Sequence, residues 1–177
     1  MAATHRRLVT ATRGGKASLV SDERLPAYAF QSVQGFEHTF LWKTEGGAAA
    51  DLNRSDTPFP TSILPGPGGT TLQIVTYPPG AVRNQHAADP GAAAREYAAR
   101  LPGLAECFEP EAPGMHATPT VDYAIIADGA LSLELDDGVI AEVSAGDIVI
   151  QQATRHAWRN RSDRPATVIF VMIDAAD

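Results

Sequence analysis

Two short stretches of the sequence hold side chains whose types and spacing suit metal or acid–base chemistry. His116, Thr118 and Asp122 are separated by even numbers of residues. In an extended strand such residues point to the same face, because side chains alternate between faces. His156 lies in a later stretch that ends at Asn160. If the stretches pair, two imidazoles and one carboxylate converge, a ligand set typical of non-haem Fe(II).

The same three side chains allow two kinds of chemistry. A metal ion held by His116, Asp122 and His156 could polarise a carbonyl or activate water or O₂ in its open positions. Without a metal, a histidine in an apolar interior titrates near neutral pH and can act as acid or base. Asp122 would then orient or charge one histidine. The residues alone leave both alternatives open.

Other side chains are candidates for the wall of the same pocket. Trp158 has the parity of His156, so we expect it to face inward, either as core packing or as a stacking wall for a ring-shaped ligand. Thr118 shares the inward face with His116. Tyr123 has the opposite parity, so we expect it outside. His38 could enter the pocket from an earlier strand.

Residues 81–114 interrupt the β pattern. Residues 91–101 are rich in Ala, Arg and Glu and stop at Pro102-Gly103, which predicts a short helix. This helix could be a lid over the pocket or could pack on the outside. Arg83 and His86 could form a rim that meets an anionic substrate. Cys107 lies among glutamates, which raise the pKa of a thiol, so we do not expect a catalytic thiolate.

The candidate residues need strands to position them, and most of the chain consists of short strand-like runs. Glycine, proline and aspartate separate these runs, and Asp137-Gly138 favours a hairpin turn. Such spacing suggests a barrel or a two-sheet sandwich. The predicted strands cover residues 7–12, 27–33, 38–44, 70–77, 121–127, 130–135, 139–143, 147–151, 156–160 and 166–173.

The composition of the chain excludes some classes of function. The chain has 177 residues, which favours a single domain. Its net charge of −7 argues against non-specific binding to nucleic acid. One cysteine cannot form an internal disulfide, and no apolar run approaches the roughly 20 residues that span a bilayer. We see no secretory signal segment, and therefore expect a cytoplasmic protein with a small-molecule ligand, without nucleic-acid or membrane partners.

The stretch 114–160 resembles the cupin superfamily, a group of small jelly-roll β-barrels. His116 fills the first histidine position of the family's first motif, and Thr118 stands where the second histidine would be. Asp122 replaces the motif glutamate. The motif glycine is Gly129, and the second motif is represented by Gly146, His156 and Asn160.

The resemblance implies an all-β jelly-roll barrel with extra N-terminal strands and one short helix in an insertion. It implies a single cupin domain over residues 1–177, in which residues 70–177 form the barrel and residues 1–69 pack on it. It also implies a homodimer, because many small cupins pair through N-terminal strands.

The resemblance further implies an enzyme that acts on a small organic metabolite and uses a divalent metal such as Fe, Mn, Zn or Ni. His116, Asp122 and His156 would be its metal ligands and catalytic residues. The reaction would be that of a dehydratase, cyclase or isomerase-type lyase, or of a dioxygenase. A non-catalytic metabolite-binding or sensor cupin is the alternative, since one fold hosts many functions.

Overall fold

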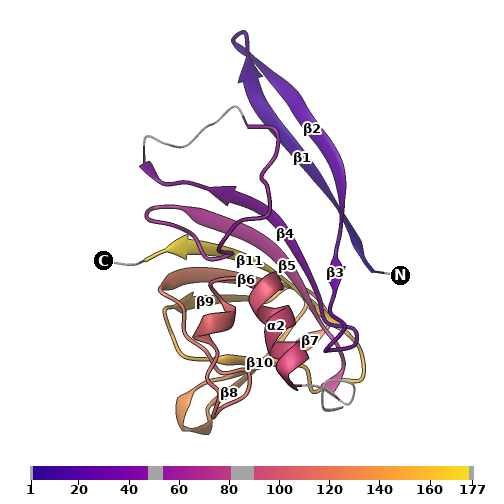
Figure 1. Cartoon of the computed structure of the whole chain (residues 1–177), viewed down its shortest axis with the longest axis vertical. Coiled ribbons are helices and arrows are strands. Elements are labelled where there is room, and N and C mark those ends of the chain that lie inside the picture. The colour runs from indigo at the N-terminus through magenta and orange to yellow at the C-terminus, as the bar shows by residue number, and fades with distance from the viewer. Residues whose placement is uncertain (1, 48–53, 81–89, 176–177) are drawn as a thin grey trace.

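Antiparallel β-strands are the main secondary structure of the protein, as the computed structural model in Figure 1 shows. The structure describes residues 2–47, 54–80 and 90–175. The larger sheet has six strands in the order β3-β4-β5-β11-β6-β9. These are β3 (Tyr28–Ala29), β4 (Glu37–Thr44), β5 (Thr70–Tyr77), β11 (Ala166–Asp174), β6 (Thr120–Asp128) and β9 (Ile148–Gln152).

A second sheet of three strands packs against the first. Its order is β10-β7-β8, formed by β10 (Ala157–Arg159), β7 (Ala130–Glu134) and β8 (Ile140–Ser144). Alternate residues of β11 are buried, as expected for a strand with one face on the core. The Trp158 ring on β10 meets the Phe170 ring on β11, with centroids 5.9 Å apart. The predicted all-β jelly-roll architecture is confirmed.

From residue 70 onward, the predicted strands agree with the structure to within two residues. The turn between β6 and β7 depends on Gly129, which has a φ of +75°. A Cβ atom at this position would lie 2.6 Å from the Pro165 carbonyl oxygen and 2.8 Å from the Ala166 Cα. Only glycine therefore fits the close approach of this turn to the start of β11.

The first third of the chain differs from the prediction. A long hairpin of β1 (Thr4–Arg13) and β2 (Lys16–Pro26) replaces the single strand expected over residues 7–12. It rises away from the two sheets in Figure 1. The strand predicted over residues 27–33 was wrong beyond the two residues of β3. There the chain turns back, the Phe30 N–H bonds to the Phe36 carbonyl, and Gly35 takes a φ of +79°.

Residues before position 70 also belong to the larger sheet. β4 forms an antiparallel ladder with β5, and β3 pairs with β4. The N-terminal part thus extends the sheet by hydrogen bonds as well as packing on it. In the part of the chain that the structure describes, no helix has the length and apolar character needed to cross a membrane.

Helix α2 (Pro90–Arg100) is the helix predicted over residues 91–101, and in Figure 1 it lies across the strands. Its Glu96 carboxylate accepts hydrogen bonds from the Tyr28 hydroxyl (2.9 Å) and from the backbone N–H groups of Gln31 and Ser32 (both 2.8 Å). Tyr97 packs its ring edge-on against Phe30. These contacts hold α2 against the loop between β3 and β4.

Candidate active site

A cavity of about 590 Å³ lies between the two sheets and helix α2. Residues 93, 94, 97 and 98 of α2 form part of its wall, so the helix covers the pocket. The rest of the wall combines aromatic and aliphatic side chains with a few polar ones. The aromatic residues are Phe36, Tyr77, Tyr97, Phe108, Trp158 and Phe170, and the polar ones include His38, Gln73, His116, Asp122 and His156.

The two predicted histidines lie side by side in this wall. The His116 N–H bonds to the His156 carbonyl (3.0 Å), and the His156 N–H bonds to the His116 carbonyl (2.9 Å). The two imidazole rings therefore lie in contact, with centroids 4.3 Å apart and planes inclined by 52°. Phe108 packs on the other side of His116, with centroids 4.7 Å apart. Residues forty positions apart in the sequence thus form one pair of imidazoles in contact.

Backbone carbonyls fix the tautomer of both imidazoles. His116 Nδ1 lies 3.1 Å from the Gly114 oxygen, and His156 Nδ1 lies 2.8 Å from the Thr154 oxygen. A carbonyl oxygen only accepts hydrogen bonds, so each Nδ1 carries a proton and donates it. In the neutral rings, each Nε2 therefore keeps a lone pair.

The environment keeps both histidines neutral at pH 7. Burial and, to a lesser extent, the neighbouring His116 lower the pKa of His156 to about 4, against the opposing bond to Thr154. Burial also lowers the pKa of His116, although the Gly114 carbonyl and Glu109 act in the opposite direction. The pair consequently presents two proton acceptors to the cavity.

Asp122 reaches the cavity from β6. Its side chain is buried, and this burial raises its pKa to about 6 despite an opposing hydrogen bond from Thr120. The Oδ1 atom has no hydrogen-bond partner. Asp122 is therefore a carboxyl group that exchanges its proton near neutral pH.

The described residues do not form a complete metal site. Among them, no group of three or more His, Cys, Asp or Glu side chains is placed to hold a metal ion. Thr118, at the family's second histidine position, is buried with its hydroxyl 2.7 Å from that of Thr120, and it does not line the cavity. The imidazole Nε2 atoms suit a metal, but the third ligand is not assembled beside them. Arg83 and His86 lie outside the described residues.

Gln73 is a polar residue of the cavity wall that the sequence did not reveal. His38 is buried, and its Nε2 lies 2.7 Å from Gln73 Oε1, while Gln73 Nε2 donates to the Met172 sulfur (2.9 Å). His38 is a candidate from the sequence, whereas Gln73 is not. The alternation within residues 70–77, which buries Thr71, Gln73 and Val75, is the signal that could have found it. Tyr123 faces outward, as expected.

Cys107 fits the expectation of an unreactive thiol. Its sulfur donates to the Gly103 carbonyl (3.3 Å). Burial raises the pKa of this thiol, and the negative charge of Glu106 raises it further. A thiolate is thereby disfavoured at neutral pH.

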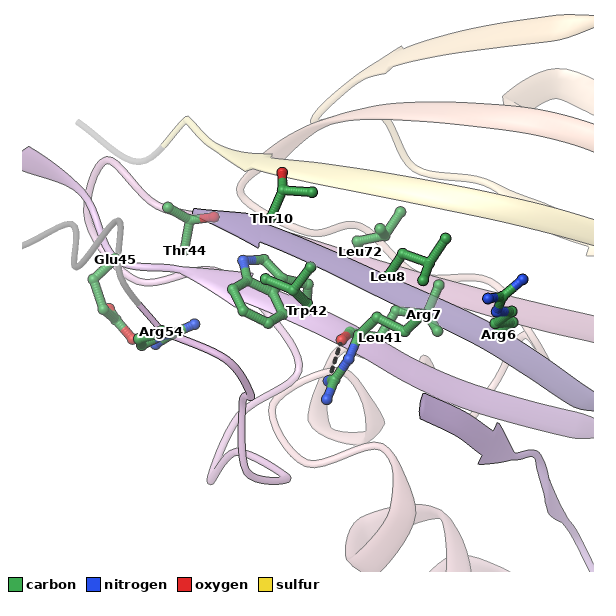
Figure 2. A pocket seen from close by; sticks show the side chains of 11 residues that line it. Arg6, Arg7, Leu8, Thr10, Leu41, Trp42, Thr44, Glu45, Arg54 and Leu72 are labelled. Atoms are coloured by element: carbon green, nitrogen blue, oxygen red, sulfur yellow. Dashed lines mark hydrogen bonds between the residues drawn. The ribbon is translucent and has the colours of Figure 1, made fainter. Parts of the chain in front are cut away.

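A second hollow of about 540 Å³ lies between β1 and the strands β4 and β5. In Figure 2 the Arg7 side chain reaches the Leu41 carbonyl, and Arg54 lies beside Trp42. Arg7 also pairs with Glu23, and Arg6 pairs with Asp22. The cations of this hollow are therefore already engaged, and the acid–base groups belong to the first cavity.

The chain is similar to known proteins over part of its length. A family profile described as "Cupin domain" matches residues 105–172. The chain is 39% identical over 62 residues to "Phomopsin biosynthesis cluster protein C'" of Diaporthe leptostromiformis, covering 34% of this chain and 33% of that protein. It is 33% identical over 87 residues to "Oryzines biosynthesis cluster protein J" of Aspergillus oryzae, covering 49% and 45%.

A third relative is "Cupin-domain-containing oxidoreductase srdD" of Neurospora crassa, 36% identical over 66 residues and covering 36% of this chain and 34% of that one. The matches thus span less than half of these relatives. Among solved structures, a "Cupin 2 conserved barrel domain protein" from Salinispora arenicola is 18% identical, with a TM-score of 0.42 over 79% of this chain and 76% of that one.

Proposed function

The chain belongs to the cupin superfamily, and we propose that its cavity is the active site of an enzyme that transfers protons on a small, largely apolar organic molecule. The observation that carries this proposal is the histidine pair. Both Nδ1–H groups are tied to backbone carbonyls, so His116 and His156 offer their Nε2 lone pairs to a cavity with aromatic and aliphatic walls.

Two neutral imidazoles in contact suit the removal of a proton from a substrate. When one Nε2 takes up a proton, the neighbouring ring opposes a second protonation, because like charges in contact are unfavourable. The pair thus acts as a base that accepts a single proton. Asp122, with a pKa of about 6, can return a proton elsewhere on the substrate. A base and an acid in one pocket support isomerase or lyase chemistry.

The shape of the cavity supports the substrate class. A volume of about 590 Å³ is in the usual range for small-molecule sites. Trp158, Phe108 and Tyr97 offer ring faces and edges to a planar ligand. Two relatives are named as biosynthesis cluster proteins, which is consistent with a metabolite as the substrate.

Deuterium incorporation tests the proposal even while the natural substrate is unidentified. A panel of aromatic ketones and enols is incubated with the protein in D₂O, and exchange at acidic C–H positions is followed by proton NMR. We expect catalysed exchange for a subset, lost in His156→Gln and retained in His5→Gln, a matched change in the hairpin. If no compound exchanges above the buffer rate, or if His156→Gln exchanges normally, the proposal is wrong. A ligand that binds without exchange would favour the non-catalytic binding module.

Metal-dependent oxidation is the second candidate. It is favoured by the relative named as an oxidoreductase and by the two Nε2 lone pairs, which would hold a divalent metal together with a third ligand. Such an ion would supply Lewis-acid or O₂ chemistry. Elemental analysis of protein purified without chelators or a His-tag decides the matter. Less than about a tenth of an equivalent of Fe, Mn, Zn or Ni excludes this candidate, since a competent site retains its ion.

A further inference from the structure

Two buried glutamine side chains, Gln73 and Gln151, point into the interior of the barrel, and of these two only Gln73 has hydrogen-bond partners. Gln73 accepts from His38 and donates to Met172. Gln151 on β9 is 3% exposed, and neither its Oε1 nor its Nε2 has a hydrogen-bond partner. A buried amide without partners is rare in folded proteins and usually indicates an unseen partner such as a water or a ligand.

Gln151 does not stand alone. Asp122 lies directly opposite Gln151 across the β6–β9 ladder and directly opposite Met172 across the β6–β11 ladder. Met172 in turn lies opposite Thr71 on β5. Side chains opposite one another on one face of antiparallel strands lie within contact range. All four residues are buried, so they form one inward row across four adjacent strands.

The three polar members of this row share one property. Asp122 Oδ1, Thr71 Oγ1 and both polar atoms of Gln151 lack hydrogen-bond partners. Asp122 and Met172 belong to the cavity wall. Gln151 lies directly beside Asp122 across the β6–β9 ladder, so a polar group that a ligand brings to Asp122 also comes near the unpaired Gln151 amide.

We propose that Asp122 and Gln151 form a subsite that binds a hydroxyl group at one end of an otherwise apolar ring-shaped ligand. This inference rests on the proposed function of the cavity and specifies its substrate. A hydroxyl can donate to the unpaired Asp122 Oδ1 and accept from the Gln151 amide, so one small group pairs with both. A methyl group in its place would leave both side chains unpaired.

A pair of glutamine variants tests whether the row is built for a ligand. Removing the unpaired amide in Gln151→Met should raise the melting temperature of the ligand-free protein by about 2–4 °C. The matched change Gln73→Met removes the partner of buried His38 and should lower the melting temperature. If Gln151→Met is as destabilising as Gln73→Met, the amide is satisfied in the protein and the proposal fails.

Binding of two small probes tests the ligand class. Para-cresol and para-xylene differ by a hydroxyl in place of a methyl group, and their affinities are measured by ligand-observed NMR. The wild type should prefer para-cresol by about tenfold or more, and Gln151→Met should reduce this preference to about threefold or less. Equal binding of the two probes to the wild type, or an unchanged preference in Gln151→Met, overturns the proposal. Deuterium exchange that depends on His156 would still stand in that case, so the two failures are distinguishable.

Discussion

His116 and His156 exchange both of their backbone hydrogen bonds, and this reciprocal pair brings their rings to a centroid distance of 4.3 Å. The backbone register therefore sets the ring contact, and the Gly114 and Thr154 carbonyls set the tautomers. The site depends on main-chain geometry more than on neighbouring side chains. Substitutions that keep this backbone register should leave residues 116 and 156 side by side, even when they remove the imidazole that accepts a proton.

The pH dependence of stability should reveal two buried groups that act in opposite directions. Between about pH 6 and pH 4, the unfolded chain protonates His156 and the folded protein does not, so this residue makes stability fall as the pH falls. Asp122 takes up its proton at about pH 6 in the folded state but only at lower pH when unfolded, so it makes stability rise.

Single variants should separate these two effects. Asp122→Asn should lose about 2–3 kcal/mol more stability than the wild type on going from pH 6.5 to pH 4, because the histidine effect is no longer offset. His156→Gln should lose less stability than the wild type over the same pH range, because the effect of His156 is removed. Denaturant unfolding at several pH values measures both. Parallel curves for the wild type and the two variants would mean that neither pKa is displaced by folding.

Gly129 should be far less replaceable than a glycine of the same backbone conformation. Gly138 has a φ of +73°, close to the +75° of Gly129, but a Cβ at Gly138 would meet nothing within 4 Å. Gly138→Ala should therefore cost only the strain of a left-handed residue, about 1–2 kcal/mol. Gly129→Ala adds a clash with backbone atoms near Ala166 and should cost at least about 3 kcal/mol. Equal losses in thermal unfolding would contradict this interpretation of the turn.

The sequence predicted the second half of the chain well because its strands alternate and its turns carry glycine or aspartate. The inward parity of Thr118, Asp122 and Trp158 follows from that alternation and agrees with their burial. The hairpin β1–β2 could not be predicted in full, since β2 is mostly polar and has no buried residue to mark a face. The motif asparagine Asn160 is structural: its amide donates to the Tyr77 and Arg164 carbonyls.

Other parts of the site depend on contacts that no local pattern reveals. The pairing of Gln73 with His38 joins two strands 35 residues apart. The sequence spacing also does not show that Asp122 lies apart from the histidine pair. Parity predicts which face of a strand a side chain occupies, but not how far along the sheet it lies from another residue. The sequence thus indicated the pocket, while the arrangement of its polar groups required the structure.

Helix α2 should be held less firmly against the loop between β3 and β4 when the Glu96 carboxylate is removed. Glu96 accepts three hydrogen bonds from the loop and the tyrosine beside it, and these bonds lower its pKa although burial raises it. Glu96→Ala should destabilise this region by about 1–2 kcal/mol and speed amide hydrogen exchange in α2 by about tenfold. The exposed Glu111→Ala is the control and should change neither. Unchanged exchange in Glu96→Ala would show that aromatic packing alone holds the helix.

The homodimer expected through the N-terminal strands stays a prediction, and the outer face of the larger sheet is a second surface through which two copies could pair. Tyr123 lies opposite Ile150 across the β6–β9 ladder, and Ile148 lies beside them. Their exposed fractions are 41%, 53% and 62%. Neighbouring apolar side chains on β11 continue this face, and an apolar patch of this kind on a sheet marks an interaction surface.

A second copy of the chain is the occupant we expect, because the same apolar face of two copies can cover itself about a twofold axis. The hairpin also exposes Leu8 and Leu19. Light scattering at micromolar concentration should report a dimer for the wild type. Ile150→Asp places a charge within this apolar face and should yield a monomer. Ile140→Asp is the matched control, because Ile140 is 42% exposed on β8 of the other sheet. A monomeric wild type, or a dimer that survives Ile150→Asp, would rule out this interface.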